Sequence, residues 1–357
     1  MDASVLMKRL EDNLDIIFDE EKYKEFLSYV ARFHRYSPFN QLLIVLQKPD
    51  AFKVAGYRKW IEEGRQVKKG EKAIGILAPK FYNVYTDVKT GERLKKNAMS
   101  RSELKKAIEF GLVEVEKKQF GYLGVSVFDI SQTIPIKGED NEDEIRMSEE
   151  GLKGSFKDLD KLVKAVKIAT EAEVRITKEL NTLDIMGYYD VVNNLIVVRE
   201  LDGVQIASTL IHEAGHAIAR RLTKDGKIIP LRDKEKVEDK DLAIISREDE
   251  EVIVESAAYA VMQELGMDVS GYSFGYIHNW ATAYREDKKE ARESILNNLK
   301  YISAITSEIL NAMEIVFGVT SDTEDKMAIQ EEKAEELLTM IEANTVRLKA
   351  SGEMRVQ

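Results

Sequence analysis

The segment His212-Glu213-Ala214-Gly215-His216 has residue types and a spacing that suit a metal ion. Apolar residues recur at helical spacing around it, which predicts a helix whose two histidines lie one turn apart on one face. Two such imidazoles can share a zinc ion, and Glu213 can act as general base on a metal-bound water. This is the arrangement that peptide hydrolysis needs. Gly215 costs about 1 kcal/mol inside a helix relative to alanine, and a closely packed strand would explain it.

A catalytic zinc ion takes three protein ligands, so the two histidines need one more donor. The chain has no cysteine and only four histidines, which makes a carboxylate the expected third ligand. A helix over residues 247–265, capped by Ser246, carries Glu251 and Glu255 four residues apart among apolar positions. We assign Glu251 as the third ligand and Glu255 as the acceptor that orients a ligand histidine. The sequence also allows the two roles to be exchanged, and structural hydrogen bonding of both histidines is the alternative to metal binding.

The bulk composition describes an ordered globular protein. A length of 357 residues predicts two domains, and 44% hydrophobic with 33% charged residues excludes general disorder. The first residues lack a basic stretch followed by an apolar run, and no apolar run approaches the roughly 18 residues of a membrane span. A cytoplasmic protein without a membrane segment is therefore expected. A net charge of −11 argues against nucleic-acid binding by the whole surface, and the oligomeric state stays open.

The order of predicted elements indicates an α+β fold. An acidic stretch divides the chain into a first domain, a linker, a second domain and a charged C-terminal helix, at residues 1–137, 138–150, 151–320 and 321–357. Helical spacing of apolar residues predicts one or two helices over residues 3–34, and further helices over residues 39–47, 56–63, 100–110, 155–171, 204–222, 247–265, 274–318 with a break, and 323–350. Runs rich in β-branched and aromatic residues predict strands over residues 73–77, 122–130, 173–176 and 188–198. The second domain is thus expected to be mainly helical with a small sheet.

Residues 48–80 form a basic segment within this acidic chain. They hold nine lysines or arginines against four acids, with Phe52, Tyr57 and Trp60 interleaved. Cations that follow phosphates and rings that stack on bases are typical of single-strand binding. The alternative is a small aromatic core with a solvated basic face outside it. The predicted DNA contacts are Arg58, Lys59, Trp60, Lys68, Lys69 and Lys72.

Residues 188–280 resemble the zincin peptidases of the ImmA/IrrE-like and polyvalent-protein groups. The resemblance is carried by the run YYDVVNNLIVV, then TLIHEAGH, then a helix with E-E-x-x-x-E, and the block Y-S-x-x-Y-I-x-x-W. It implies zinc on His212, His216 and a helix glutamate, with Glu213 catalytic. It also implies that a strand over residues 190–198 lies beside the cleft, where an extended peptide pairs with its edge.

The first part of the chain is similar to the N-terminal single-stranded-DNA-binding domain of ArdC-type antirestriction proteins. Short blocks occur in the same order, namely PFNQ, GYRKW, VKKGEKAI and VFDISQT. The similarity covers about residues 5–136, but residues 81–120 do not match, so contacts there stay unassigned. Asn40 and Gln41 of the first block are expected to contact DNA or, alternatively, to hold a turn.

The two resemblances together imply a zinc metallopeptidase coupled to a single-stranded-DNA-binding domain on a mobile genetic element, with a protein or peptide substrate. The alternative is an antirestriction protein that protects DNA by binding it, in which peptidase activity is dispensable.

Overall fold

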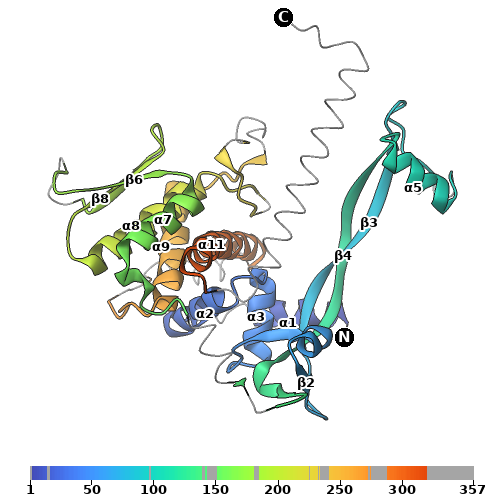
Figure 1. The fold of residues 1–357 in the computed structure, drawn as a ribbon, viewed down its shortest axis with the longest axis horizontal. Coiled ribbons are helices and arrows are strands. Elements are labelled where there is room, and N and C mark those ends of the chain that lie inside the picture. Colours follow the sequence, from blue (N-terminus) through green and yellow to red (C-terminus); the bar gives the residue numbers. More distant parts are fainter. Residues whose placement is uncertain are drawn as a thin grey trace, which may run out of the picture.

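The computed structural model of the chain describes residues 2–13, 17–95, 98–138, 141–142, 151–180, 185–224, 226–231, 233, 241–271, 274 and 288–319. Helices and strands are mixed throughout these ranges, as an α+β fold requires (Figure 1). Most of the expected linker and the whole expected C-terminal helix lie outside the described residues. The division into two domains therefore stays a prediction. Within the described part of the chain, no helix is both long enough and apolar enough to cross a membrane.

The first part of the chain begins with short helices, of which the first two start at a side-chain cap. Of the one or two helices expected over residues 3–34, the structure has two, because Asp2 and Asp19 each accept a backbone hydrogen bond at a separate helix start. Pro38 opens the next helix at a position where its missing N–H costs nothing. These helices are α1 (Ala3–Asp12), α2 (Glu20–Arg32), α3 (Pro38–Gln47) and α4 (Tyr57–Glu62).

A long antiparallel ribbon follows these helices. It is made by β3 (Ile74–Asp87) and β4 (Val113–Asp129), which pair in register from Ile74↔Val127 to Asp87↔Val113. The strands expected over residues 73–77 and 122–130 are only the inner ends of this ribbon, so that prediction was too short. Figure 1 shows the ribbon projecting from the rest of the molecule, with α5 (Arg101–Glu109) at its far end.

Short strands and 3-10 turns complete this part of the chain. β1 (Val54–Gly56) pairs with the other side of β4, and β2 (Arg65–Val67) pairs with β5 (Thr133–Pro135). A 3-10 turn, η2 (Ile130–Gln132), connects β4 to β5. A second turn, η3 (Ser155–Lys157), precedes the helices of the other half.

The second part of the chain packs helices against a three-stranded sheet. The helices are α7 (Leu159–Thr170), α8 (Gly203–Ala219), α9 (Arg247–Glu264) and α11 (Lys288–Phe317). The sheet has the order β6-β8-β7, formed by β6 (Glu173–Thr177), β8 (Leu195–Arg199) and β7 (Gly187–Asp190). β6 runs parallel to β8, and β7 runs antiparallel to it.

The single strand expected over residues 188–198 is a hairpin instead. The Asp190 side chain accepts hydrogen bonds from the backbone of Val192 and Asn193, and Asn194 has a φ of 46°, so the chain reverses here. β8 consequently lies between two neighbours and has no edge for a peptide. Within the described residues, β6 forms one edge of this sheet and β7 forms the other.

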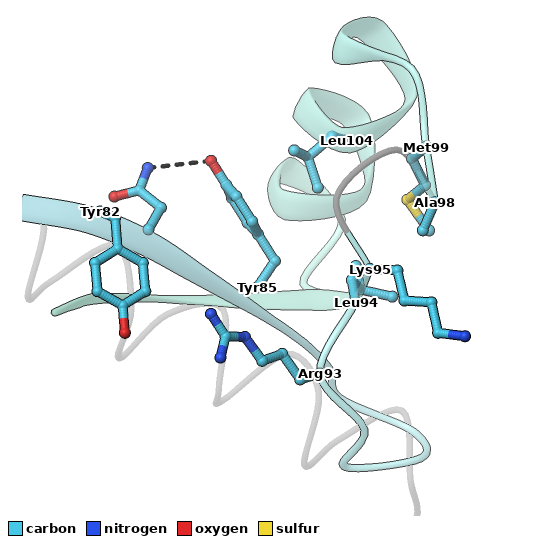
Figure 2. Close-up of a pocket in the computed structure, with 9 residues that line it drawn as sticks. Tyr82, Tyr85, Arg93, Leu94, Lys95, Ala98, Met99 and Leu104 are labelled. Atoms are coloured by element: carbon cyan, nitrogen blue, oxygen red, sulfur yellow. Dashed lines mark hydrogen bonds between the residues drawn. The ribbon is translucent and has the colours of Figure 1, made fainter.

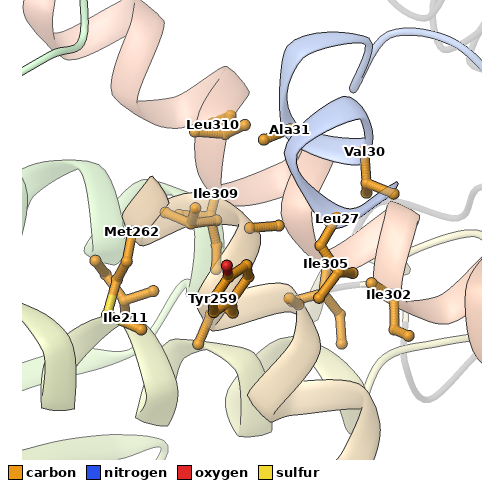
Figure 3. Packing of buried hydrophobic residues seen from close by; sticks show 14 of the residues in the cluster. Leu27, Val30, Ala31, Ile211, Tyr259, Met262, Ile302, Ile305, Ile309 and Leu310 are labelled. Atoms are coloured by element: carbon orange, nitrogen blue, oxygen red, sulfur yellow. The ribbon is translucent and has the colours of Figure 1, made fainter. Parts of the chain in front are cut away.

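One hydrophobic core runs through both parts of the chain. Leu27 on α2 packs with Ile211 on α8, Tyr259 on α9 and Ile305 on α11 in a single buried cluster (Figure 3). Polar contacts reinforce this junction, since the hydroxyl groups of Tyr23 on α2 and Ser256 on α9 lie 2.9 Å apart. The N-terminal helices therefore support the helix that carries Glu251.

Asn40 and Gln41 make buried hydrogen bonds within the fold, and Gln41 reaches across this junction to α11. Asn40 makes a paired interaction with the backbone of Leu77, donating to its carbonyl at 2.9 Å and accepting from its N–H at 2.8 Å. Gln41 is fully buried and donates to Phe33 O and to Ser303 Oγ. Both amides therefore hold the fold together, and neither is placed to contact DNA.

Candidate metal centre

Helix α8 presents the two histidines of the His-Glu-x-x-His segment side by side. Asp202 caps the helix by accepting hydrogen bonds from Val204 N and Gln205 N, and a stripe of buried apolar residues fixes its rotation against the core. His212 and His216 lie at the edge of that stripe, partly exposed. Their Nε2 atoms are 3.2 Å apart, so both rings point to the same place.

Helix α9 brings a carboxylate to that place. Glu251 Oε2 lies 3.8 Å from His212 Nε2 and 3.6 Å from His216 Nε2. All three candidate donor atoms fall within 4.8 Å of one another, and they form the one such group found in the ranges that the structure describes. Two imidazole nitrogens and one carboxylate oxygen match the donor preference of a divalent transition-metal ion. The residues present therefore fit a metal centre with a position left for a further ligand.

Two glycines allow the elements around this centre to approach closely. A Cβ atom on Gly215 would lie 2.8 Å from Val254 Cγ1, so the glycine in the motif is required by helix α9. The expectation that a strand packs against Gly215 is wrong, because the neighbour is a helix. The strand meets α8 at Gly187 instead, where a Cβ atom would lie 2.6 Å from Thr209 Cγ2 and 3.4 Å from Glu213 Cγ.

Glu250 forms a hydrogen bond with Nδ1 of His216, the ring nitrogen that points away from the three-donor group. Its Oε1 lies 3.0 Å from His216 Nδ1, and its Oε2 lies 3.1 Å from an Arg220 nitrogen. The sequence assigned this orienting role to Glu255, and the structure gives it to Glu250. Glu255 is not in the three-donor group, and the pKa of its carboxyl is raised by burial and by the charge of Glu251. Arg220 fixes the Glu250 carboxylate, which in turn fixes the orientation and the tautomer of the His216 ring.

Glu213 is buried behind the two histidines. Burial, assisted by the charge of Glu251, raises the pKa of its carboxyl to about 7, against the opposing effects of His216 and of a backbone hydrogen bond from Tyr189. A carboxyl with this pKa is protonated and deprotonated near neutral pH, as a general acid and base must be. The hydrogen bond from Tyr189 also places β7 directly beside this group.

The two histidines have pKa values shifted in opposite directions. Burial and the neighbouring ring of His216 lower the pKa of His212. Burial would also lower the pKa of His216, but the hydrogen bond to Glu250 and the charges of Glu213 and Glu251 outweigh it and raise that pKa. His216 therefore holds a proton more readily than His212 in the metal-free site, and a bound cation would compete with such a proton.

The predicted DNA contacts on and near α4 are only partly available. Trp60 is fully buried and its Nε1 donates to Phe128 O at 2.9 Å, so its ring cannot stack on a base. Lys68 is exposed but its Nζ donates to Ser131 O at 2.8 Å. Of the other predicted contacts, Lys59 is half-buried, and the exposed cations are Arg58, Lys69 and Lys72.

One known family matches the first part of the chain. Residues 17–114 match the family model of the N-terminal domain of the anti-restriction factor ArdC. This segment contains α2 to α5 and all of β1 to β3, and it ends at the start of β4.

Individual relatives extend over more of the chain. An uncharacterized protein of Bacillus anthracis is 27% identical over 305 residues, which cover 82% of this chain and 48% of that protein. The chain thus spans about half the length of this curated relative. The antirestriction protein ArdC from plasmid R388 is similar in its metal-free crystal structure, with 19% identity, a TM-score of 0.38 and coverage of 77% of this chain and 86% of that one. Its Mn(II)-bound structure gives 17% identity, a TM-score of 0.37 and coverage of 80% and 98%. Residues 17–114 are therefore similar to an ArdC N-terminal domain, and the candidate metal centre lies outside that matched segment.

Proposed function

We propose that this chain is an antirestriction-type protein that binds single-stranded DNA and protects it, and that its second half carries a divalent metal centre. The observation that carries the proposal is the match of residues 17–114 to the ArdC N-terminal domain. Exposed cations on this segment supply the phosphate contacts that sequence-tolerant binding needs. Protection follows if the bound strand is shielded from host nucleases.

Equilibrium binding to a labelled single-stranded oligonucleotide tests this function. The affinity for the single strand is expected to exceed that for the duplex of the same sequence and to fall as salt rises. The complementary oligonucleotide and a restriction endonuclease are then added, and the fraction of DNA left uncut measures protection. Absence of single-strand binding at low salt would overturn the proposal.

A zinc-dependent peptidase is the second candidate function, and the position and pKa of Glu213 favour it. A zinc ion on the three donors would activate a water molecule and polarise a carbonyl group. Burial raises the pKa of Glu213 to about 7 in the metal-free site, and its carboxylate, next to the ligand His212, would take a proton from that water and return it to the leaving amine. The edge strand β7 touches Glu213 through Tyr189, so an extended substrate would pair with Gly187–Asp190.

Glu213→Gln separates the two functions, because it removes the general base and leaves the three donors unchanged. Zinc content by mass spectrometry should match that of the wild-type protein, while cleavage of a fluorescently labelled denatured casein should be lost. Unchanged DNA protection in this variant would support the first function and make hydrolysis dispensable. Loss of protection together with loss of cleavage would make hydrolysis part of the biological role. Glu248→Gln, on the exposed start of α9, is the matched control.

A further inference from the structure

Four side chains on the ribbon of β3 and β4 and its connection form a row of cations and rings, here called the ring ladder. They are Lys80, Phe120, Tyr82 and Arg93. Lys80 Nζ lies 5.6 Å from the centre of the Phe120 ring. The Phe120 ring lies 5.7 Å from the Tyr82 ring, at an interplanar angle of 71°. Arg93 Cζ lies 5.8 Å from the centre of the Tyr82 ring. Two rings thus lie between two cations along one side of the ribbon.

A β-bulge creates this arrangement. Lys80 pairs with Gly121 and the next residue, Phe81, pairs with Gln119, so Phe120 is an extra residue with no partner opposite. A bulge turns a side chain away from the regular alternation of a strand. Here it brings the Phe120 ring beside Tyr82, which regular pairing would not do.

The two rings of the ladder are exposed, because no hydrophobic core lies beside them. Phe120 is 58% exposed and Tyr82 is 39% exposed, and the ribbon that carries them projects away from the other elements (Figure 1). Exposed aromatic side chains gathered at one place indicate a binding surface. Lys80 and Arg93 each lie over one of these rings at a cation–π distance.

The charge of the ribbon is opposite to that of the chain. Residues 80–123 contain ten lysines and arginines against six aspartates and glutamates, an excess of four positive charges, whereas the whole chain has a net charge of −11. A partner of the ribbon is therefore expected to be anionic. An unpaired nucleic-acid strand offers both kinds of contact, since its bases can stack on the rings and its phosphates can contact the cations.

A pocket continues the ladder at its outer end. It has a volume of about 750 Å³, and Tyr82 and Arg93 form one of its sides. Figure 2 shows Tyr82 and Arg93 on one side of the strand and Tyr85 with Leu104 on the other. Met99 adds an apolar wall and Lys95 adds a further cation. The pocket therefore adds apolar space and a further cation beside Tyr82 and Arg93.

We infer that the ring ladder is a stacking platform for consecutive unpaired bases, with the adjoining phosphates on Lys80 and Arg93. The inference rests on the proposed single-strand binding and assigns its place on the protein. It moves the base contacts from α4, where Trp60 is buried, to the ribbon. Phe120 lies beyond the segment that matches the ArdC N-terminal domain.

Binding of fluorescently labelled oligo(dT) by the full chain tests the inference. Phe120→Ala and Tyr82→Ala should each weaken binding by about 5- to 150-fold, the effect of losing one base-stacking contact. Phe120→Tyr should retain wild-type affinity, because its ring still stacks. Phe110→Ala is the matched control, since Phe110 is 76% exposed at the end of α5 and belongs to no ring contact of the ladder. Thermal unfolding verifies that each variant is folded.

Two further readouts identify the contact chemically. An oligonucleotide with 2-aminopurine should lose fluorescence on binding the wild-type protein and keep it with Phe120→Ala, because stacking quenches the base. Lys80→Gln and Arg93→Gln should each reduce the dependence of log affinity on log salt by about 0.7.

Wild-type affinity in both alanine variants would overturn the inference while single-strand binding by the wild type stands, and the ladder would then be a surface for another partner. Equal loss in Phe120→Tyr and Phe120→Ala would also overturn it. Absence of binding by the wild type would overturn the inference together with the proposed function.

Discussion

The metal centre and the ring ladder are built by opposite means. The metal centre takes its three donors from two helices packed in the core, where one helical turn and the contact between Gly215 and Val254 set their positions. The ladder takes its four side chains from two exposed strands and a connection, where register and a bulge set their positions. A small ion demands fixed geometry, whereas a flexible polymer is served by a row of equivalent contacts. The difference predicts that single changes act strongly at the first site and moderately at the second.

Loss of a metal ligand should have the largest effect. His216→Ala and Glu251→Ala are each expected to lower metal affinity by more than about 100-fold, beyond the 10- to 100-fold cost of losing an outer hydrogen-bond partner. Chelator competition with the purified protein measures this affinity. Glu255→Ala should bind metal almost as the wild type does. If Glu255→Ala lost as much affinity as Glu251→Ala, Glu255 would be a ligand and the geometry of the centre would differ from this structure.

The junction between the two parts of the chain should give the next largest effect. Burial alone would raise the pKa of Glu314 on α11, but His34 Nε2 at 3.3 Å and Arg35 at 3.0 Å outweigh it and lower that pKa to about 2. Since the unfolded carboxyl has the ordinary value of 4.5, the charged form contributes about 3 kcal/mol of stability above pH 5. This contribution is lost as the pH falls from 4.5 towards 2.

Urea unfolding at several pH values measures this contribution. The free energy of unfolding of wild type minus that of Glu314→Gln should be about 3 kcal/mol near neutral pH and should shrink below pH 4.5. A constant difference down to pH 3 would mean that the charge on Glu314 does not join the two parts of the chain.

Removal of the outer support of the metal centre should have a smaller effect. Glu250→Ala frees the Nδ1 side of His216 and is expected to lower metal affinity by about 10- to 100-fold. Arg220→Gln should produce part of this loss, because Arg220 only holds Glu250 in place. Glu248→Ala on the exposed face of the same helix is the control. Metal affinity equal to that of the wild type in Glu250→Ala would show that packing alone orients the ring.

The same contrast explains what the sequence could predict. His212, His216 and Glu251 lie on helices whose faces follow from local spacing, so these residues were brought together as expected. Glu250 was missed because the crossing of α8 and α9 decides which acid faces His216. Arg220, one turn after His216, was the available signal.

The ribbon depends on contacts that local spacing does not describe. Phe81 pairs with Gln119, across an intervening segment that contains a helix, and no local pattern fixes such a register. The reversal at Asn194 was missed for a related reason, because apolar residues continue on both sides of the turn. Trp60 among lysines was compatible with either a stacking ring or a small core, and only the position of β4 decides between them.

Trp60 gives the smallest effect and the sharpest test of where DNA binds. Trp60→Phe removes the hydrogen bond to Phe128 O and part of a buried ring, so it should lower the free energy of unfolding by about 1–2 kcal/mol. Its affinity for oligo(dT) should stay within about twofold of the wild type, whereas Phe120→Ala should lose at least about fivefold. A folded Trp60→Phe protein that binds oligo(dT) tenfold more weakly would place the base contacts on α4. The ring ladder would then not be the site at which bases stack.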